Sequence, residues 1–344
     1  MRSVPAGRPG SPSGRRAREE WIVPDHVLAA RCELGESGQG IAVVFWRLFG
    51  ENISGETQIA GVITQLRQAQ AQSPVQVPLL LMTDQEGGLV RRLPGQPVLS
   101  EKQIGQSSDP VAAAAAAGTG AGQNLAGVGM NVNLAPVLDV YYKTGNFIDQ
   151  YQRSYSSSPA VVSGCGQAFI TAQQQTGVAA AAKHFPGLGS ATKNQNTDGG
   201  PVTLTVSLTK LHTIDEVPYP AAVGAGVKLV MVSWAIYPAL DAKRPAGLSP
   251  AVIGQELRGR NAFTGVTITD ALEAGALSAF GATGQRAVAA AGAGMDLILC
   301  SARDVSQGEA ATAALASALG SGQLDPAAFN AAVNRVTALR AGLF

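Results

Sequence analysis

The sequence has few aromatic residues, few cysteines and no long apolar run, and each shortage excludes a class of protein. Aromatic side chains make up only 5% of the 344 residues, so a large core must be built mainly from Ala, Val, Leu and Ile. The three cysteines, Cys32, Cys165 and Cys300, are too widely spaced for a disulfide framework or a metal-ligand motif. No run of about 18 apolar residues is present, so we expect no membrane span.

Strong net charge and several nucleotide or hydrolase motifs are also missing. The chain carries 25 basic and 24 acidic residues, a net charge of +1, which gives no reason to expect nucleic acid or an anionic membrane as partner. There is no Gly-x-Ser-x-Gly elbow, phosphate loop or HExxH motif. The stretch Gly118-Thr-Gly-Ala-Gly122 lacks the spacing of a nucleotide loop and lies in an alanine-rich helical pattern.

The N-terminal stretch has no apolar segment of the kind that secretory signals contain. Residues 1–20 are rich in Arg, Pro, Gly and Ser, which argues against a signal peptide. We interpret residues 1–35 as a disordered or atypical N-terminal segment and residues 36–344 as the catalytic-type domain. The compartment stays open: the missing signal indicates the cytoplasm, whereas an incomplete N-terminus would allow an extracellular or cell-surface protein.

What the sequence does contain is a regular alternation of apolar strands with helical patterns. Candidate strands occupy residues 21–24, 40–46, 77–83, 130–139, 177–183, 227–233, 265–270 and 295–300. Helical patterns lie between them, at 54–70, 111–125, 159–175, 207–223, from Ser249-Pro250 onward and at 284–293, and two helices end the chain, the last from Asp325-Pro326. This alternation predicts βαβ units and an α/β (β/α)8 TIM-type barrel, irregular at its weak first strand, with a doubly wound sheet as the alternative.

Polar residues gather where the predicted strands end, and this favours the barrel. Asp84, Asp139, Lys183 with His184, and Asp270 each follow an apolar strand. In a barrel the carboxyl ends of the strands converge on one pocket. After Lys183-His184 the prolines and glycines of Pro186-Gly-Leu-Gly189 end regular structure, so we expect a mobile polar loop there.

Each of these residues also has a purely structural interpretation. Asp270 could cap a following helix or face the pocket as nucleophile or general base, and Asp84 could form a turn or bind substrate hydroxyls. From the residues alone, Arg92 and Arg153 are better interpreted as surface charges. Asp139 is best interpreted as a structural residue that holds a loop.

Seven stretches, taken together and in order, resemble glycoside hydrolase family 3, and most closely its single-domain β-N-acetylhexosaminidases of the NagZ type. They are Thr83-Asp-Gln-Glu-Gly-Gly88 with Arg92; Asn133-Leu-Ala-Pro-Val-Leu-Asp139; Arg153-Ser-Tyr155; Lys183-His-Phe-Pro-Gly187; Met231-Val-Ser233 with Tyr237-Pro-Ala-Leu240; Leu248-Ser-Pro250; and Gly265-Val-Thr-Ile-Thr-Asp-Ala-Leu272. The resemblance covers roughly residues 36 to 342.

The resemblance implies a role for each matching polar residue. Asp270 would be the nucleophile of a retaining mechanism on terminal β-linked N-acetylhexosamine of cell-wall or chitin-type glycans. The residues implied to hold the sugar are Asp84, Arg92, Arg153, Lys183 and His184. A carboxylate suits attack on an oxocarbenium-like centre. No metal or organic cofactor is implied, and the expected partner is a carbohydrate substrate bound by a monomer.

The loop after Lys183-His184 departs from the family pattern. There the family subgroup usually presents an Asp-x-His dyad as general acid/base, but this chain has Asn194 and Asn196, and Leu188 and Trp234 stand where many members have histidines. Asn cannot donate a proton at neutral pH. Asp198, two residues further on, is the candidate replacement. Two alternatives stay open: a carbohydrate-binding pseudo-enzyme, and a family 3 glycosidase with another sugar specificity.

Overall fold

The computed structural model describes residues 45–48, 50–72 and 77–343. The predicted first strand at 21–24 and the N-terminal segment 1–35 lie outside these residues. The central feature is a six-stranded parallel sheet with the order β1-β2-β5-β6-β7-β10. Its strands are β1 (Phe45–Arg47), β2 (Leu80–Thr83), β5 (Val132–Asn133), β6 (Ala179–Phe185), β7 (Leu229–Val232) and β10 (Val266–Thr269).

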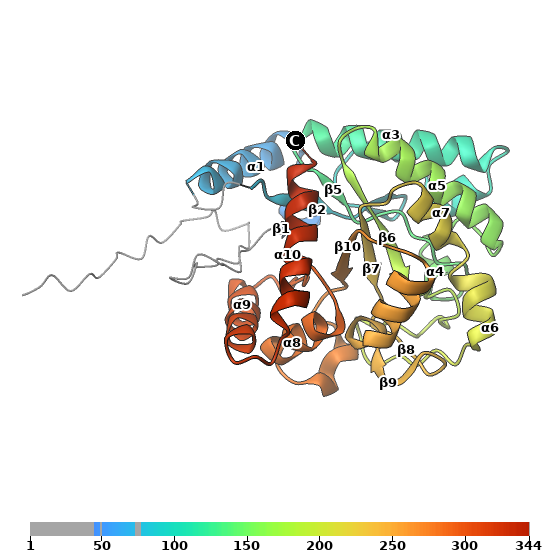
Figure 1. Cartoon of the computed structure of the whole chain (residues 1–344). Coiled ribbons are helices and arrows are strands. Elements are labelled where there is room, and N and C mark those ends of the chain that lie inside the picture. Colours follow the sequence, from blue (N-terminus) through green and yellow to red (C-terminus); the bar gives the residue numbers. More distant parts are fainter. Residues whose placement is uncertain (1–44, 49, 73–76, 344) are drawn as a thin grey trace, which may run out of the picture.

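Helices connect these strands and surround the sheet (Figure 1). The α-helices are α1 (Glu56–Ala71), α2 (Glu101–Gly105), α3 (Pro110–Gly127), α4 (Phe147–Gln150), α5 (Pro159–Gln174), α6 (Leu208–Lys210), α7 (Pro218–Gly224), α8 (Thr283–Ala293), α9 (Val305–Gly320) and α10 (Pro326–Ala341). Two hairpins, β3 (Gln85–Gly87) with β4 (Val90–Arg91) and β8 (Ile236–Tyr237) with β9 (Asp241–Pro245), extend from the strand ends. Short 3-10 turns lie at η1 (Gly50–Asn52), η3 (Ala246–Leu248) and η5 (Gly275–Phe280).

The helix starts that the sequence indicates are present. Asp109 accepts a hydrogen bond from the backbone N–H of Ala112 and is followed by Pro110 at the first position of α3. Asp325 and Pro326 open α10 in the same way. In each case the side chain satisfies a backbone donor that the first turn leaves free, and the proline sits where no N–H is needed.

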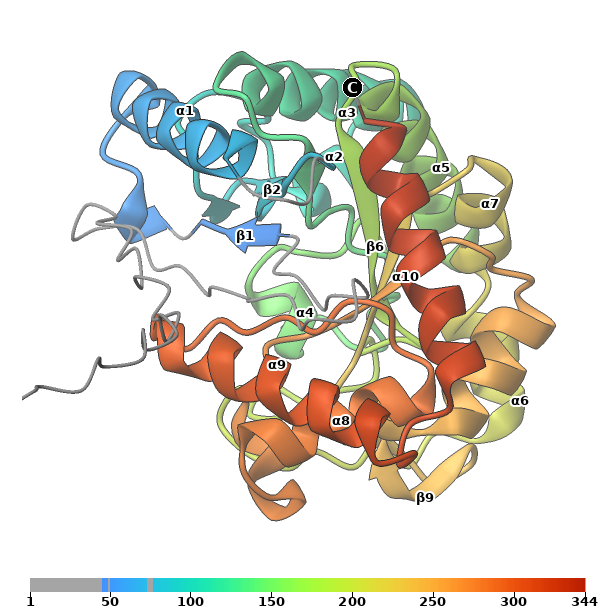
Figure 2. The same cartoon turned by 60° about the vertical axis from the view of Figure 1, so that its left-hand side comes forward.

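Both faces of the parallel sheet are buried, and side chains alternate between them. Ala179 and Ala181 of β6 face an apolar cluster inside the curled sheet, together with Leu80 and Met82 of β2. The intervening alanines Ala180 and Ala182 face the layer of helices. This two-sided burial explains why the strands are continuous apolar runs. Val336 and Leu339 of α10, which runs in front of the sheet, complete the inner cluster (Figure 1, Figure 2).

Glycines let α3 and α5 pack closely against each other. A Cβ atom added at Gly118 would lie 2.3 Å from the carbonyl oxygen of Phe169 in α5, and one at Gly122 would lie 2.1 Å from Thr176 Oγ1. The glycine-rich stretch that superficially resembles a nucleotide loop is therefore a helix contact surface, as its alanine-rich context indicates.

The TIM-type architecture is confirmed, but the sheet is not a closed barrel. Residues 295–300, which the sequence predicts as the last strand, make only one isolated bridge, from Leu297 to Ile268 of β10. The segment still bonds to β10: the N–H of Leu297 donates to the carbonyl oxygen of Thr267, and the N–H of Thr269 donates to that of Leu297. The prediction of a regular strand is wrong, because these bonds do not continue into a ladder of paired residues. Within residues 45–48, 50–72 and 77–343, no strand pairing joins this segment to β1.

Some connecting segments also differ in detail from the predictions. Residues 146–158, for which the sequence predicts neither a strand nor a helix, contain α4, which Asn146 caps by accepting a hydrogen bond from the N–H of Asp149. The helical stretches after residue 207 and after Ser249 contain wide π-type turns, η2 (Leu211–Asp215) and η4 (Ala251–Arg260). Ser249 Oγ still accepts a hydrogen bond from the N–H of Val252, as expected of a helix cap.

Candidate active site

The inward-facing series of strand residues leads to three of the predicted site residues. In a strand, side chains two residues apart lie on the same face. Lys183, Asp84 and Asp270 each continue the inward-facing series of one strand. The apolar residues two and four positions before them all belong to the inner cluster: Ala179 and Ala181, Leu80 and Met82, and Val266 and Ile268. Because the strands are parallel, these three polar side chains lie at the carboxyl end of the sheet, the end where α/β barrels bind ligands.

A buried network of ion pairs lies at this end. Lys183 Nζ is 2.8 Å from Asp84 Oδ1 and 2.6 Å from Glu86 Oε1. Arg153 binds the Glu86 carboxylate through two parallel hydrogen bonds, Nε to Oε2 and Nη2 to Oε1, both 2.9 Å long. Lys183, Asp84 and Glu86 are almost fully buried. Two cations and two carboxylates thus meet in a site largely removed from water.

The opposite charges in this network shift the pKa values of Glu86 and Arg153. Burial opposes the ionised form of Glu86, but Arg153 and Lys183 outweigh it and lower the pKa of Glu86 to about 2. Burial also opposes the charge on Arg153, yet Glu86 raises the pKa of Arg153 above its usual value. Glu86 and Arg153 are therefore charged at neutral pH and present fixed charges to a ligand.

The pKa of a neighbouring carboxyl group, that of Glu101, is shifted in the opposite direction. Glu101 at the start of α2 is buried, and its Oε1 accepts a hydrogen bond of 2.9 Å from the N–H of Val137. Burial and then the charge of Glu86 raise the pKa of Glu101 well above its usual value. Both effects favour the neutral form of Glu101 beside the charged network.

Asp139 holds His184 and the following turn. Asp139 Oδ2 lies 2.8 Å from His184 Nδ1, and Asp139 Oδ1 accepts hydrogen bonds from the N–H groups of His184 (3.3 Å) and Leu188 (2.7 Å). The other ring nitrogen of His184 lies 3.4 Å from Arg153 Nη2. Since the arginine can only donate, the arrangement suits a neutral His184 whose Nδ1–H points to Asp139. The interpretation of Asp139 as a structural residue agrees with these contacts.

Asp270 follows β10 and is partly exposed. Its Oδ1 accepts a hydrogen bond of 2.7 Å from the N–H of Ala271. Trp234, at the end of β7, is buried and donates from Nε1 to the carbonyl oxygen of Ala271 at 2.8 Å. The tryptophan therefore holds the backbone next to Asp270 in place.

The loop that carries Asn194, Asn196 and Asp198 is tied to the chain just beyond Asp270. The N–H groups of Gly275 and Ala276 donate to the carbonyl oxygens of Asp198 (2.9 Å) and Thr197 (3.0 Å). Asn196 Oδ1 accepts from the N–H of Asp198 at 2.9 Å, which forms a local turn. Asp198 and Asn194 are exposed, and Asn196 is half-buried. These contacts hold residues 197–198 beside the segment that follows the tip of β10.

The interpretation of two arginines as surface charges is wrong. Arg153 pairs with the buried carboxylate of Glu86, and its side chain is only 17% exposed. Arg92 is half-buried, and its backbone N–H donates to Gln85 Oε1 and to the carbonyl oxygen of Asp84. Among the described residues, Arg92 Nε is buried without a hydrogen-bond partner, and no ion pair joins Arg92 to the Lys183 network. The structure thus brings Arg153 into this network and leaves Arg92 beside it.

Glu86 is the site residue that the sequence reasoning missed. It lies two residues after Asp84 in an extended segment, so the same period of two that places Asp84 at the pocket also places Glu86 there. That signal was available in the sequence. Its pairing with Arg153, 67 residues away, was not.

Comparison with known proteins agrees with this geometry. A family model described as the glycosyl hydrolase family 3 N terminal domain matches residues 39–339. The chain belongs to glycosyl hydrolase family 3. The family prediction made from the seven stretches is thereby confirmed.

Individual proteins also resemble the chain over most of its length. A protein of Arthroderma benhamiae named an uncharacterized secreted glycosyl hydrolase is 49% identical over 77% of this chain and 75% of its own. The solved structure of a family 3 β-N-acetylglucosaminidase from a Paenibacillus species is 35% identical, with a TM-score of 0.82 over 87% of this chain. The chain spans only 56% of that enzyme's length.

A second solved structure is similar in length to this chain. The β-N-acetylhexosaminidase of Beutenbergia cavernae is 32% identical, with a TM-score of 0.76 over 86% of this chain and 88% of its own. That solved chain is therefore little longer than the part that matches this chain.

Proposed function

We propose that this family 3 protein is a retaining glycoside hydrolase that removes terminal β-linked N-acetylhexosamine from cell-wall or chitin-type glycans. The observation that carries the proposal is the position of Asp270, which continues the inward face of β10 at the same end of the sheet as the Lys183, Asp84, Glu86 and Arg153 network. The names of the similar β-N-acetylglucosaminidase and β-N-acetylhexosaminidase support the sugar class.

In the proposed reaction Asp270 acts as the nucleophile. Its carboxylate attacks the anomeric carbon while the glycosidic bond breaks and the leaving oxygen takes a proton from an acid. Water then attacks the anomeric carbon of the glycosyl-enzyme ester, gives its proton to the same group acting as base, and releases Asp270. The partial exposure of Asp270 is what a group that must meet substrate requires.

The charged network suits the binding of sugar hydroxyls and an acetamido group. Lys183 and Arg153 donate hydrogen bonds, Asp84 accepts them, and their mutual pairing fixes their positions before substrate arrives. Arg92 and His184 are proposed to complete the set. The fixed positions of these binding residues would orient the sugar, while Asp270 would form the covalent bond to it.

Asp198 is the proposed acid/base, because Asn194 and Asn196 cannot donate a proton at neutral pH. Its loop is tied by two backbone hydrogen bonds to Gly275 and Ala276, a few residues beyond Asp270. This attachment supports the proposal, because it puts the backbone of residues 197–198 beside the segment that follows Asp270, and because Asp198 is exposed.

The deciding experiment measures hydrolysis of an aryl β-N-acetylglucosaminide by the full chain. We expect Asp270→Asn to lower kcat by more than about 10³-fold, as the loss of a catalytic nucleophile does, and mass spectrometry to detect a glycosyl group on the Asp270 peptide. Glu309→Gln, which removes an exposed carboxylate from α9, is the control and should retain the wild-type rate. If the Asp270→Asn variant hydrolyses the substrate at the wild-type rate, the assignment of Asp270 as nucleophile is refuted.

The two alternative functions, a carbohydrate-binding protein and a glycosidase of other specificity, predict different results in binding and hydrolysis measurements. Saturable binding of N-acetylglucosamine by calorimetry without any turnover would favour a carbohydrate-binding protein that has lost catalysis. Turnover of other aryl glycosides in a panel, but not of the N-acetylglucosaminide, would favour a different sugar specificity.

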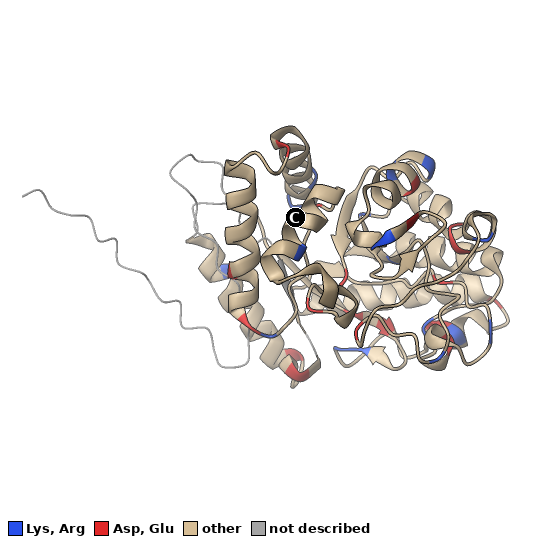
Figure 3. Cartoon of the chain, turned by 90° about the horizontal axis from the view of Figure 1, so that it is seen from below, with Lys and Arg blue, Asp and Glu red and all other residues tan. Residues whose placement is uncertain are grey.

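The proposed unit is a monomer in which residues 36–344 form one catalytic domain. Figure 3 shows acidic and basic residues interspersed along the described part of the chain. None of the helices in the described part of the chain is both long and apolar enough to cross a lipid bilayer. Light scattering on the purified chain tests the monomer directly.

A further inference from the structure

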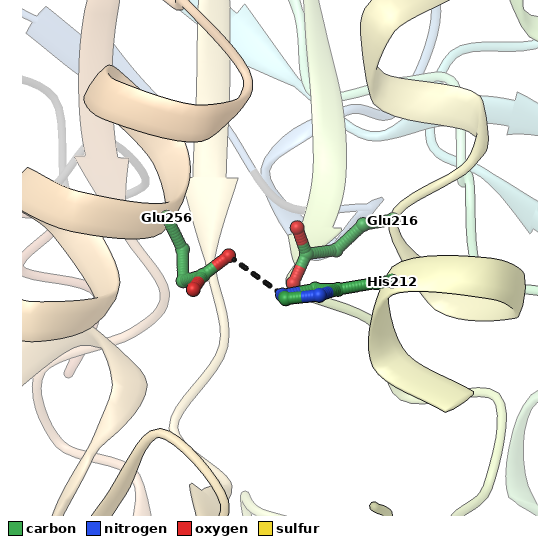
Figure 4. Close-up of side chains that lie close together, drawn as sticks. All are labelled: His212, Glu216 and Glu256. Carbon is green, nitrogen blue, oxygen red and sulfur yellow. Dashed lines mark hydrogen bonds and ion pairs between the residues drawn. The ribbon is translucent and has the colours of Figure 1, made fainter. Parts of the chain in front are cut away.

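Three potential metal ligands converge between the two π-type turns, η2 and η4. His212 lies in η2 and Glu216 follows four residues later, so both side chains lie on the same face of the turn. Glu256 reaches them from η4 (Figure 4). One ligand atom from each residue lies within 4.8 Å of the others.

The separation of two of these ligand atoms is close to that in a small tetrahedral site. His212 Nε2 lies 3.1 Å from Glu256 Oε2. Ligand atoms about 2.0–2.1 Å from a zinc ion are separated by about 3.3 Å in a tetrahedron. His212 and Glu256 are 23% and 15% exposed, so an ion can reach them from solvent.

Glu216 supplies an independent sign that a ligand belongs here. Its side chain is 1% exposed, and its Oε1 is buried without a hydrogen-bond partner among the described residues. One oxygen of its carboxylate lies beside the His212 ring, and the other points away from the ring (Figure 4). A buried carboxylate oxygen without a partner is costly, and a bound cation would remove that cost.

The existing partners leave room for such an ion. Asn261 Nδ2 donates to Glu216 Oε2 at 2.8 Å, so this contact orients the carboxylate and does not occupy Oε1. Arg260 Nε lies 3.5 Å from Glu216 Oε2 and 3.7 Å from Glu256 Oε2, and its side chain is 45% exposed. These separations are longer than those of a tight charge-assisted hydrogen bond, so Arg260 is a weak competitor for the same carboxylates.

We propose that His212, Glu216 and Glu256 bind one divalent transition-metal ion of the zinc class and thereby join η2 to η4. One imidazole nitrogen with two carboxylates suits such an ion, whereas calcium and magnesium prefer all-oxygen sites. The site has three protein ligands and an open position toward solvent. It lies outside the proposed sugar site and is independent of the proposed function.

The test is titration of metal-stripped full-length protein with zinc chloride by calorimetry. We expect one ion per chain and a rise in Tm that saturates with zinc, because an ion that binds only the folded state stabilises it. Magnesium chloride should produce neither effect. His212→Gln and Glu256→Gln, which change partly exposed side chains, should each weaken zinc binding at least about tenfold.

Two further variants make the result specific to this site. His26→Gln removes a histidine outside the described residues and should leave zinc affinity unchanged. Arg260→Gln removes the competing cation and should strengthen zinc binding several-fold, an effect that a purely structural ion pair does not produce. Cobalt(II) should give the visible absorption of a low-coordinate site in wild type, and His212→Gln should lose it.

Absence of saturable zinc binding up to about millimolar concentration, or binding that His212→Gln and Glu256→Gln leave intact, would overturn the proposal. Weaker binding in Arg260→Gln would also contradict it, since it would show that the arginine supports the site.

Discussion

Asp139 holds His184 by both its ring and its backbone, with Oδ2 2.8 Å from Nδ1 and Oδ1 3.3 Å from the backbone nitrogen. A single buried carboxylate therefore sets the ring tautomer and anchors the turn that follows. Asp139 is fully buried, so water cannot replace these contacts.

Asp139→Asn should impair catalysis more than folding. An amide cannot accept all three hydrogen bonds, so its NH₂ group must face either His184 Nδ1–H or the two backbone donors. Loss of a charge-assisted hydrogen bond of about 1.5–3 kcal/mol corresponds to a fall in kcat/KM of roughly 10- to 100-fold. Steady-state kinetics with an aryl N-acetylglucosaminide, alongside thermal unfolding, measures both effects.

Asp296→Asn is the matched control for that variant. Asp296 is also a buried aspartate, bound by Arg258, Arg335 and the N–H of Thr267. It lies beside the start of β10, at the sheet end opposite to the proposed site. We expect lower stability with unchanged kcat/KM below the unfolding temperature. An equal kinetic loss in both variants would contradict the role given to Asp139.

Glu86→Gln should remove a pH-dependent part of the stability. The folded-state pKa of Glu86 is lowered to about 2, from about 4.5 in the unfolded chain. The ionised form therefore stabilises the fold by about 3 kcal/mol above pH 5, and this contribution is lost as pH falls from about 4.5 to about 2. Denaturant unfolding of both proteins across this range should show a difference that is constant above pH 5 and shrinks below it. A difference that does not change with pH would contradict the assignment.

Asp198→Ala should separate substrates by leaving group. If Asp198 donates the proton, kcat/KM for aryl glycosides with poor leaving groups should fall by about 10²- to 10⁴-fold, while activated substrates lose little. Asn194→Ala, in the same exposed part of the loop, should leave both rates unchanged. Equal losses for good and poor leaving groups would assign the acid/base role elsewhere.

Gly118→Ala and Gly61→Ala should change stability in opposite directions. A Cβ at Gly118 would lie 2.3 Å from the Phe169 carbonyl oxygen, whereas one at Gly61 in α1 meets nothing within 4 Å. Overpacking should lower the free energy of unfolding of Gly118→Ala by about 1–3 kcal/mol. Better helix propensity should raise that of Gly61→Ala by about 0.5–1 kcal/mol. Urea unfolding measures both, and a stabilised Gly118→Ala would show that α3 and α5 can move apart.

The sequence by itself determined the order of strands and helices and the residues that end each strand. It also determined that Asp84, Lys183 and Asp270 stand at the ends of apolar strands, because that pattern lies within a few adjacent residues. The caps at Asp109 and Asp325 are local in the same sense. These features needed no information from distant parts of the chain.

Only the tertiary structure decided which charges meet. Glu86 and Arg153 are 67 residues apart, and Asp139 and His184 are 45 apart. Their pairing depends on strands and loops packing side by side and on burial that leaves no solvent to satisfy a lone charge. The same holds for His212 and Glu256, which come from two separate turns. It also holds for residues 295–300, whose apolar pattern did not reveal that their bonding to β10 would form one isolated bridge and no continuous ladder.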